Sequence, residues 1–275
     1  MARRLHQAGH TVHAWNRTQS KADPLAALGI AVHATVAEAV RQADIVVSLL
    51  ESGPAVEQVL FHAGAAQALR PGTLFIDMAS IQPREARDHA ARLGEMGLAH
   101  LDAPVSGGTV GAENGTLAIM AGGRAEDFAR AQPVFAALGR ATHVGPHGSG
   151  QLAKLANQMI VGITIGAVAE ALLFAAKGGA DMARVREAIQ GGFADSRILQ
   201  LHGQRMVDRD FAPKARMGVQ LKDMRNALGT AKEIGFDAPV TTLFEALYAE
   251  GVEHGLGELD HSGLFVELAS RNAMQ

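Results

Sequence analysis

The sequence predicts an α/β domain built on a parallel sheet at residues 1–147, followed by an all-helical domain at residues 148–275. In the first part, short β-branched runs alternate with amphipathic stretches, which is the pattern of parallel strands covered by helices. After Gly150 the strand pattern stops and only helical periodicity follows. The length of 275 residues also exceeds the usual size of one domain.

Composition narrows the class of protein. With 48% hydrophobic and 19% charged residues, the chain can bury a large core and is not disordered. The net charge of -3 and the lack of a long basic run argue against nucleic acid as a partner. The absence of cysteine excludes disulfides and a thiol nucleophile. Residues 1–10 have no apolar run behind their arginines, so we expect no signal peptide and a cytoplasmic location.

Each strand of the first domain is expected where a short β-branched or aliphatic run ends at a turn, and each helix where the apolar residues recur every three to four positions. The expected strands are Thr11–Trp15, Ala31–His33, Ile45–Leu49, Thr73–Asp77, Ala99–Asp102, Leu117–Ala121 and Ala141–Val144. The expected helices are the end of one at 1–9, then Val36–Arg41, Ala55–Phe61, Pro83–Met96 and Ala125–Leu138.

In the second domain the expected helices are Gln151–Gly178, Met182–Gln190, Ser196–Val207, Lys214–Ile234, Pro239–Glu253 and Ser262–Met274. The first of these carries only one charge, Glu170, between Met159 and Ala176, so most of its circumference is expected to be buried. The stretch is barely long enough to cross a membrane, and its alanines and glycines favour close packing on protein helices instead. We therefore expect no membrane partner and a homodimer or homotetramer that uses this helix.

A polar face interrupts this apolar helix near its start. Lys154, Asn157 and Gln158 are spaced at i, i+3 and i+4, so they share one side of the helix just after the turn at Gly148–Gly150. A lysine beside two amides suits a proton donor with groups that hold an oxygenated substrate. The alternative is an ordinary lysine at a helix start that reaches solvent.

Polar turns follow several expected strands, at the edge of the sheet where ligands bind in α/β proteins. Asn16, Arg17 and Thr18 lack the acidic residue that binds the ribose 2′-hydroxyl of NAD, and the arginine suits the 2′-phosphate of NADP. An ordinary polar turn explains them equally well. Leu49, Leu50 and Ser80 occupy the corresponding places after two further strands, where a purely structural loop is an equal alternative.

A glycine-rich loop follows the strand at Ala99–Asp102. In Ser106-Gly107-Gly108 the glycines leave the backbone N–H groups unobstructed, which suits an anion such as a carboxylate. The loop alone is weak evidence, but together with the lysine helix it indicates a small carboxylate-bearing substrate. None of the 12 histidines stands at metal-ligand spacing, so no metal site is expected.

Four segments together resemble the β-hydroxyacid dehydrogenase family: Asp102–Gly108, Gly115–Gly123, Gly148–Gln158 and Leu221–Asp223. The resemblance covers essentially the whole chain and implies a Rossmann-type first domain, a helical domain for substrate and dimerisation, and hydride transfer with a nicotinamide cofactor. It also implies that Lys154 is the catalytic acid/base. The Ser106 loop and the helix amides would hold the substrate, and Lys222 would lie near the cofactor.

The chain departs from the family at its start. The family's first strand and G-x-G-x-x-G turn precede the position of Met1, and no other glycine cluster replaces them. The sequence thus looks truncated, through a late start codon, a degenerate paralogue or an engineered deletion. The missing strand would lie within the sheet, so its loss removes hydrogen-bond partners on both sides. We expect weak dinucleotide binding by the chain as written.

The sequence indicates the family more clearly than it indicates the substrate. The pair Asn157 and Gln158, with the NADP-type turn at Arg17, favours a tartronate semialdehyde (2-hydroxy-3-oxopropionate) reductase that uses NADP, with NAD possible. A 3-hydroxyisobutyrate dehydrogenase is the alternative. A catalytically silent binding or dimerisation protein is the alternative of another class, which retention of Lys154 disfavours.

Overall fold

The computed structural model describes residues 1–274, and the chain divides into two compact units. The first unit is Met1–Lys154 and the second begins at Leu155. The division falls inside the long helix α8 (Ser149–Lys177), a few residues beyond the boundary expected from the sequence.

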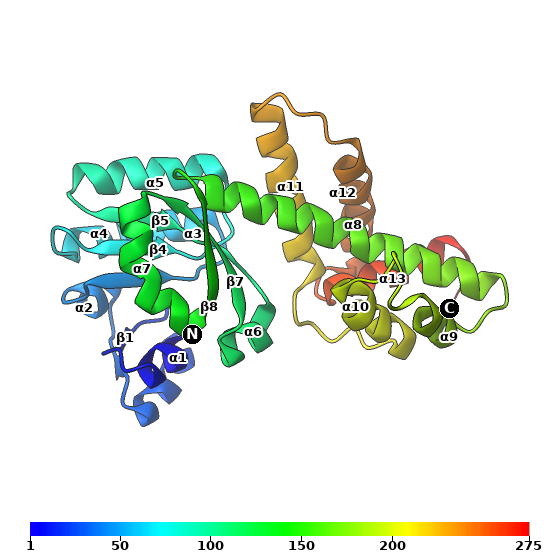
Figure 1. Cartoon of the computed structure of the whole chain (residues 1–275), viewed down its shortest axis with the longest axis horizontal. Helices are drawn as coiled ribbons and strands as arrows, with labels where there is room; N and C mark the ends of the chain where they lie inside the picture. Colours follow the sequence, from blue (N-terminus) through cyan, green and yellow to red (C-terminus); the bar gives the residue numbers. More distant parts are fainter. Residues whose placement is uncertain (275) are drawn as a thin grey trace. The chain divides into compact units, whose positions relative to one another are not determined.

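The first unit alternates strands and helices (Figure 1). Its strands are β1 His13–Ala14, β2 Ala31–Val32, β3 Ile45–Ser48, β4 Leu74–Asp77, β5 Ala99–Asp102, β6 Val105–Ser106, β7 Leu117–Gly123 and β8 Gly139–Gly145. Its α-helices are α1 Ala2–Gln7, α2 Val36–Val40, α3 Gly53–Glu57, α4 Ala65–Ala68, α5 Pro83–Glu95, α6 Gly108–Asn114 and α7 Ala125–Leu138. Short 3-10 helices η1 Gln19–Lys21 and η2 Asp23–Leu28 and the π-helical turn η3 Gln58–His62 complete it.

The Rossmann-type parallel sheet is confirmed in its central strands. β3, β4 and β5 pair in parallel, and the main sheet continues in the order β3-β4-β5-β7-β6, with β8 beside β7. β7 runs antiparallel to β5 and β6, which the sequence did not predict. β1 and β2 form a separate two-stranded parallel sheet. Within residues 1–274, β1 therefore has no strand partner in the main sheet.

Helices cover both faces of the main sheet. Along β4, Phe75 packs among residues of α2, α3, α4 and α5, whereas Leu74 and Ile76 pack among residues of α7 and the start of the chain. This alternation follows from the period of two in a strand. Because both faces are buried, β4 and β5 are buried at every position, as expected for parallel strands.

Most expected elements agree with the structure to within a few residues, and β5 and α7 agree exactly. The main correction concerns the glycine loop. The loop expected after Ser106 is instead the start of the seven-residue helix α6, preceded by the short strand β6. Backbone hydrogen bonds such as Gly111 N–H to Gly107 O, at 3.0 Å, begin the helix directly at the glycines.

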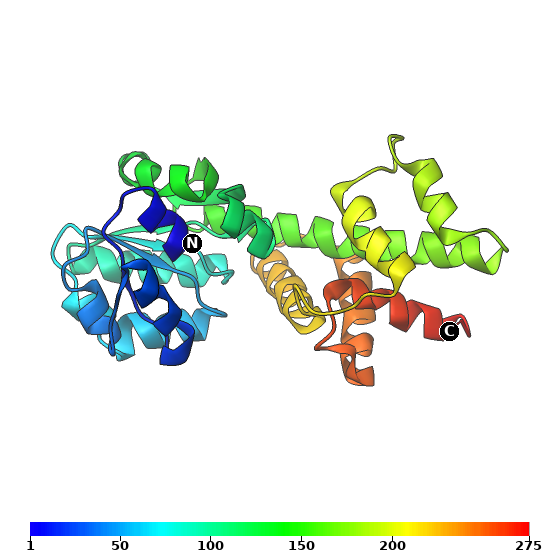
Figure 2. The same ribbon diagram turned by 90° about the horizontal axis from the view of Figure 1, so that it is seen from below.

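The second unit is helical, with α8 running along its whole length (Figure 2). The other elements are α9 Met182–Ile189, α10 Arg197–Asp208, α11 Met217–Glu233, α12 Pro239–Gly251, the π-helical η4 Val252–Leu256, the 3-10 helix η5 His261–Gly263 and α13 Leu264–Arg271. Its core joins Leu172 of α8 to Leu199, Met224, Tyr248 and Phe265 of the other helices.

α8 is only partly covered by its own chain. Within residues 1–274 it is the one helix long and apolar enough to cross a membrane, with a mean hydropathy of 2.1 over its most apolar window. Only 39% of that window is buried inside the chain, so a single copy leaves much of the apolar circumference of α8 uncovered. Length and composition alone are weak evidence of a membrane span, because core and interface helices share them.

Candidate functional site

The candidate site begins at the carboxyl ends of the parallel strands. Ser48, Asp77 and Asp102 are in register across β3, β4 and β5. The loops that follow therefore leave the sheet at the same edge, and they carry the predicted Leu49, Leu50 and Ser80. Leu49 is 54% exposed, so it presents apolar surface at the edge where a planar ligand group can bind.

The predicted cofactor turn follows β1, in the smaller sheet. The backbone N–H of Thr18 donates to Asn16 Oδ1 at 2.9 Å, which fixes the turn around Arg17. Arg17 is exposed and has no hydrogen-bond or ion-pair partner among residues 1–274, so its guanidinium is available to a phosphate. The structure thus leaves this cofactor turn accessible.

The predicted carboxylate-binding residues adopt glycine-specific backbone conformations. Gly107 has φ 132° and Gly108 has φ 63°, and both angles favour glycine. A β-carbon at Gly107 would also lie 3.2 Å from Leu117 Cδ2. Ser106 pairs with Ala118 at the start of this turn, so its position is fixed by the sheet.

The start of α8 is bound tightly to the same edge of the sheet. Asp102 Oδ1 accepts a hydrogen bond from Gly148 N–H at 2.8 Å, and Oδ2 accepts one from Gln151 N–H at 3.0 Å. The Gln151 side chain accepts from Ile81 N–H at 3.1 Å and donates to Ala79 O at 2.8 Å. Two buried side chains therefore connect α8 to the ends of β4 and β5.

Glycine allows this close approach. A β-carbon at Gly150 would collide with the carbonyl oxygens of Asp102 and Met120, so the helix backbone packs directly on β5 and β7. Lys154 lies one turn later, at i+4 from Gly150, and is only 9% exposed. This burial argues against the alternative of an ordinary lysine that reaches solvent.

Asp77, at the end of β4, is fully buried. Its Oδ1 accepts a hydrogen bond from Ala79 N–H at 3.0 Å, while Oδ2 has no hydrogen-bond partner among the described residues. Burial raises the pKa of Asp77 to about 7; the hydrogen bond from Ala79 opposes this rise, and the nearby carboxylate of Asp102 adds to it. Asp77 therefore changes its protonation state near neutral pH.

This pKa predicts how stability depends on pH. Because the folded pKa of about 7 lies above the ordinary 3.8, the folded state holds a proton that the unfolded state has released. The contribution of protonated Asp77 to the free energy of unfolding is fully present below pH 3.8 and is lost as the pH rises through 7. The total loss is at most about 4 kcal/mol. Urea unfolding at pH 5 to 8 should show Asp77→Asn gaining stability relative to the wild type as the pH rises. A constant difference would contradict the assignment.

The amides of α8 belong to a network with α11. Asn157 Nδ2–H donates to Gln158 Oε1 at 2.8 Å, and Gln158 Nε2–H donates to Asp223 Oδ2 at 2.7 Å and to Gln220 Oε1 at 3.3 Å. Gln220 Nε2–H donates back to Gln158 O at 2.9 Å. The Gln158 side chain thus holds the amide of Asn157 in place.

Lys222 lies beside this network. Its Nζ is 3.1 Å from Asp223 Oδ1, so the buried Asp223 joins Lys222 to Gln158. The two helices can approach because a β-carbon at Gly162 of α8 would lie 2.6 Å from Gln220 Nε2. The structure therefore places the predicted Lys222 in one hydrogen-bonded group with Gln158.

Asp102, Gln151, Gln220 and Asp223 support the predicted residues but were not selected as site residues from the sequence. Asp102 and Asp223 lie inside the segments that carry the family resemblance, so the sequence could have identified them as site residues. Gln151 and Gln220 have no local signal, because their partners are 72 and 62 residues away in the chain.

Comparison with known proteins agrees with this geometry. Residues 1–145 match the family described as the NAD binding domain of 6-phosphogluconate dehydrogenase. Residues 148–268 match the family described as the NAD-binding domain of NADP-dependent 3-hydroxyisobutyrate dehydrogenase. The chain belongs to the β-hydroxyacid dehydrogenase family. It is therefore an NAD(P)-dependent hydroxyacid dehydrogenase, an oxidoreductase that uses a nicotinamide cofactor.

Individual relatives of this β-hydroxyacid dehydrogenase point to two activities. The chain is 43% identical over 266 residues to 2-hydroxy-3-oxopropionate reductase of Escherichia coli, covering 96% of this chain and 91% of the relative. It is 35% identical to the probable 3-hydroxyisobutyrate dehydrogenase-like 1 of Arabidopsis thaliana, with coverage of 99% and 82%. The solved 3-hydroxyisobutyrate dehydrogenase of Mycobacterium tuberculosis with L-serine has a TM-score of 0.89, 31% identity and coverage of 97% and 94%.

Proposed function

We propose that this dehydrogenase reduces 2-hydroxy-3-oxopropionate with NADPH. The observation that carries the proposal is the 43% identity to the Escherichia coli reductase over nearly the whole chain. The buried Lys154 and the oriented Asn157 support an active enzyme, because a silent binding protein has no physical need for a lysine in this position. This substrate is a small carboxylate, as the glycine turn at Ser106 suggests.

In the proposed mechanism the cofactor supplies a hydride to the aldehyde carbon of the substrate. Arg17, Leu49, Leu50 and Ser80 are the residues proposed to hold the cofactor, and Lys222 is proposed to lie near it. The exposed Arg17 and Leu49 fit its phosphate and ring groups. The glycine turn expected to hold the diphosphate is not among the 275 residues.

The remaining chemistry belongs to the protein. As the C–H bond forms, the carbonyl oxygen gains negative charge, and the Lys154 ammonium donates a proton to it to give the hydroxyl group. Lys154 then regains a proton from solvent. The backbone at Gly107 and Gly108, with the Ser106 hydroxyl, binds the carboxylate. Asn157 accepts a hydrogen bond from the hydroxyl on C2, while Gln158 holds its amide in place.

The proposal is tested with two aldehydes that differ in one group. 2-Hydroxy-3-oxopropionate has a hydroxyl on C2 where 2-methyl-3-oxopropionate, the aldehyde of 3-hydroxyisobutyrate, has a methyl group. We expect kcat/KM to favour the hydroxyl substrate by roughly tenfold or more, because a site that binds a hydroxyl group rejects an analogue without it. A preference for the methyl substrate would identify a 3-hydroxyisobutyrate dehydrogenase.

The assay is run on the 275-residue chain and on a version extended at its N-terminus by a first strand and G-x-G-x-x-G turn. If only the extended chain turns over substrate, the inactivity of the 275-residue chain is explained by weak cofactor binding. NADPH binding without turnover of either substrate would instead favour the catalytically silent protein.

The choice of NADP is tested at Arg17. If its guanidinium contacts the 2′-phosphate, Arg17→Ala should remove roughly 1.5–3 kcal/mol of the preference for NADPH over NADH, the scale of a hydrogen bond to a charged group. Cofactor affinities are measured by nucleotide fluorescence. Lys21→Ala, which removes an exposed cation four residues later, is the control and should leave the preference unchanged. Equal binding of both cofactors by the wild type would reject the assignment.

We also propose that α8 forms the interface of a homodimer or homotetramer. Its exposed side carries Glu170 and, at helical spacing around it, six apolar residues that form a stripe: Leu152, Ala156, Ile160, Ala167, Ala171 and Phe174. Ile160 is 65% and Phe174 is 80% exposed, and a second copy would remove this surface from water.

Charges placed on this stripe should separate the subunits. The double variant Ile160→Asp, Phe174→Asp should sediment as a monomer at concentrations where the wild type is oligomeric, because each buried apolar side chain contributes roughly 1.5–3 kcal/mol. Phe236→Asp is the control, since Phe236 is 58% exposed but lies outside α8. A wild type that sediments as a monomer would refute the interface.

A further inference from the structure

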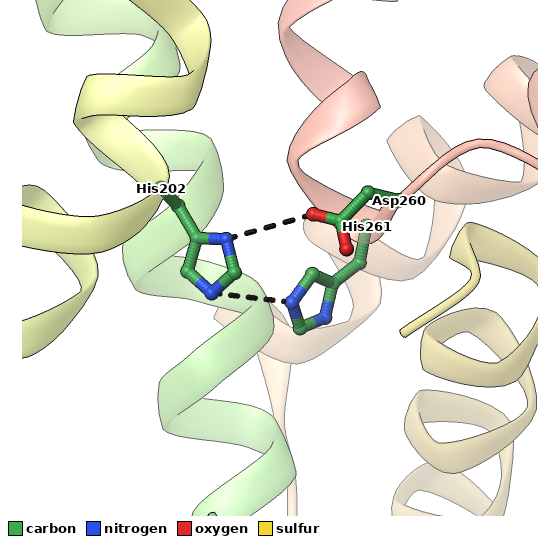
Figure 3. Close-up of side chains that lie close together, drawn as sticks. All are labelled: His202, Asp260 and His261. Atoms are coloured by element: carbon green, nitrogen blue, oxygen red, sulfur yellow. Dashed lines mark hydrogen bonds and ion pairs between the residues drawn. The ribbon is translucent and has the colours of Figure 1, made fainter. Parts of the chain in front are cut away.

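A second group of chemically active side chains lies in the helical unit, outside the proposed catalytic residues. His202 projects from α10, while Asp260 and His261 lie at the start of η5 (Figure 3). His202 Nε2 is 3.3 Å from His261 Nε2, and His202 Nδ1 is 3.6 Å from Asp260 Oδ1. Potential ligand atoms of all three residues lie within 4.8 Å of one another.

Asp260 has a structural role that fixes its charge and position. Its Oδ1 accepts from Ser262 Oγ–H at 2.7 Å and from Ser262 N–H at 3.2 Å. Its Oδ2 accepts from the N–H groups of Lys214 and Ala215 and is 3.2 Å from Arg205 Nη1. The Arg205 guanidinium and these hydrogen-bond donors surround the carboxylate and stabilise its negative charge. Asp260 is therefore an anion whose oxygens are already occupied by donors.

This carboxylate determines which nitrogen of His202 carries the proton. A lone pair on Nδ1 would face the negative charge of Asp260, so the favoured tautomer has the proton on Nδ1 and the lone pair on Nε2. A carboxylate that orients a histidine in this way is the usual second partner of a metal-binding imidazole. His202 Nε2 lies opposite Nε2 of His261 (Figure 3).

The rings of His202 and His261 are not arranged as in a simple hydrogen bond between two imidazoles. Their planes are at 82° and their centroids are 4.6 Å apart, so the nitrogens do not meet head-on. The exposed pair His13 and His33 gives the contrast, with Nδ1 and Nε2 only 2.8 Å apart and rings at 28°. Two nitrogens bound tetrahedrally to zinc at about 2.0–2.1 Å are about 3.3 Å apart, which matches His202 and His261.

We propose that His202 and His261 bind a divalent transition-metal ion through their Nε2 atoms, with Asp260 holding His202 in the required tautomer. The imidazoles suit Zn²⁺, Ni²⁺ or Cu²⁺. His261 is 9% exposed and the His202 side chain 19%, so solvent completes the coordination. The ion connects α10 to η5 and stabilises the helical unit without taking part in hydride transfer.

The site is tested with Zn²⁺ by isothermal titration calorimetry on the full chain without a histidine tag, in the absence of substrate. The wild type should bind one ion per chain with an increase in melting temperature. His202→Gln and His261→Gln should each weaken binding at least tenfold and abolish the increase. His202→Cys should retain binding, because a thiolate is a zinc ligand. His33→Gln is the matched control and should bind like the wild type.

A measurement on the wild type does not depend on whether the variants fold. In ¹⁵N NMR of the imidazole groups, two of the 12 histidines should shift at Nε2 on addition of one equivalent of Zn²⁺. Unshifted resonances, or an equal loss of binding in His33→Gln, would overturn the proposal. Because no activity is measured, failure of this site leaves the proposed reductase function untouched.

Discussion

Replacement of Lys154 with alanine is expected to lower the rate of aldehyde reduction by roughly 100- to 10,000-fold, the usual contribution of general acid catalysis. Lys154 is buried, with 9% exposure, one turn after the point where α8 packs on the strand ends. Without its ammonium, the developing alkoxide must take its proton from water. The binding of NADPH should remain nearly intact, because the proposed cofactor contacts lie on other residues.

The measurement is single-turnover reduction of 2-hydroxy-3-oxopropionate by bound NADPH, with cofactor affinity measured separately by fluorescence. Lys154→Arg should fail as well, because a guanidinium hardly ever releases a proton and its planar group places the donors differently. Lys177→Ala is the control, since this exposed lysine at the end of α8 donates to Asn272 O, far along the helix from Lys154. Its rate should equal that of the wild type.

For Lys222 we expect a loss of binding, in contrast to the loss of rate expected for Lys154. Held by Asp223 at 3.1 Å, its proposed role is to bind cofactor and substrate. Lys222→Ala should therefore weaken binding more than it slows the chemical step. If Lys154→Ala retained more than about a tenth of the wild-type rate, above the range of general acid catalysis, Lys154 would not be the acid and the silent-protein alternative would gain support.

Local sequence patterns were sufficient for most of the fold. The buried strand β5 and the amphipathic helix α7 were predicted to the residue, because each combines a clear apolar period with turn residues at both ends. Local patterns failed where pairing is non-local. The antiparallel course of β7 depends on partners at Leu101 and Val105, and no periodicity within Leu117–Gly123 specifies strand direction.

The candidate site divides in the same way. The spacing of Lys154, Asn157 and Gln158 was visible on one helix, but the hydrogen bonds of Gln158 to Asp223 and Gln220 cross 65 and 62 residues. Its role in holding Asn157 thus emerges only from the packing of α8 on α11. His202 and His261, 59 residues apart, were not recognised as neighbours for the same reason.

Asp102→Ala is expected to cost about 2–4 kcal/mol of stability and, through α8, to slow the reaction. The substitution leaves the N–H groups of Gly148 and Gln151 buried without an acceptor, and each such loss costs about 1–3 kcal/mol. Burial raises the pKa of Asp102, while these two hydrogen bonds lower it. Burial thus partly destabilises the ionised carboxylate, so removing it costs less stability than the two lost hydrogen bonds alone would suggest.

The effect on turnover follows from the position of α8. Lys154 lies one turn beyond Gln151, and a displacement of about 1 Å at a reacting group can lower a rate roughly 100-fold.

Urea unfolding and single-turnover reduction are measured together for Asp102→Ala and for Asp127→Ala. Asp127 is equally buried and pairs with Arg124 and Arg130, but it lies on α7, which carries none of the proposed catalytic residues. Both variants should lose stability, whereas only Asp102→Ala should lose turnover, since only Asp102 fixes the helix that carries the acid. An equal loss of turnover in both would mean that general destabilisation, and not the placement of Lys154, explains the effect.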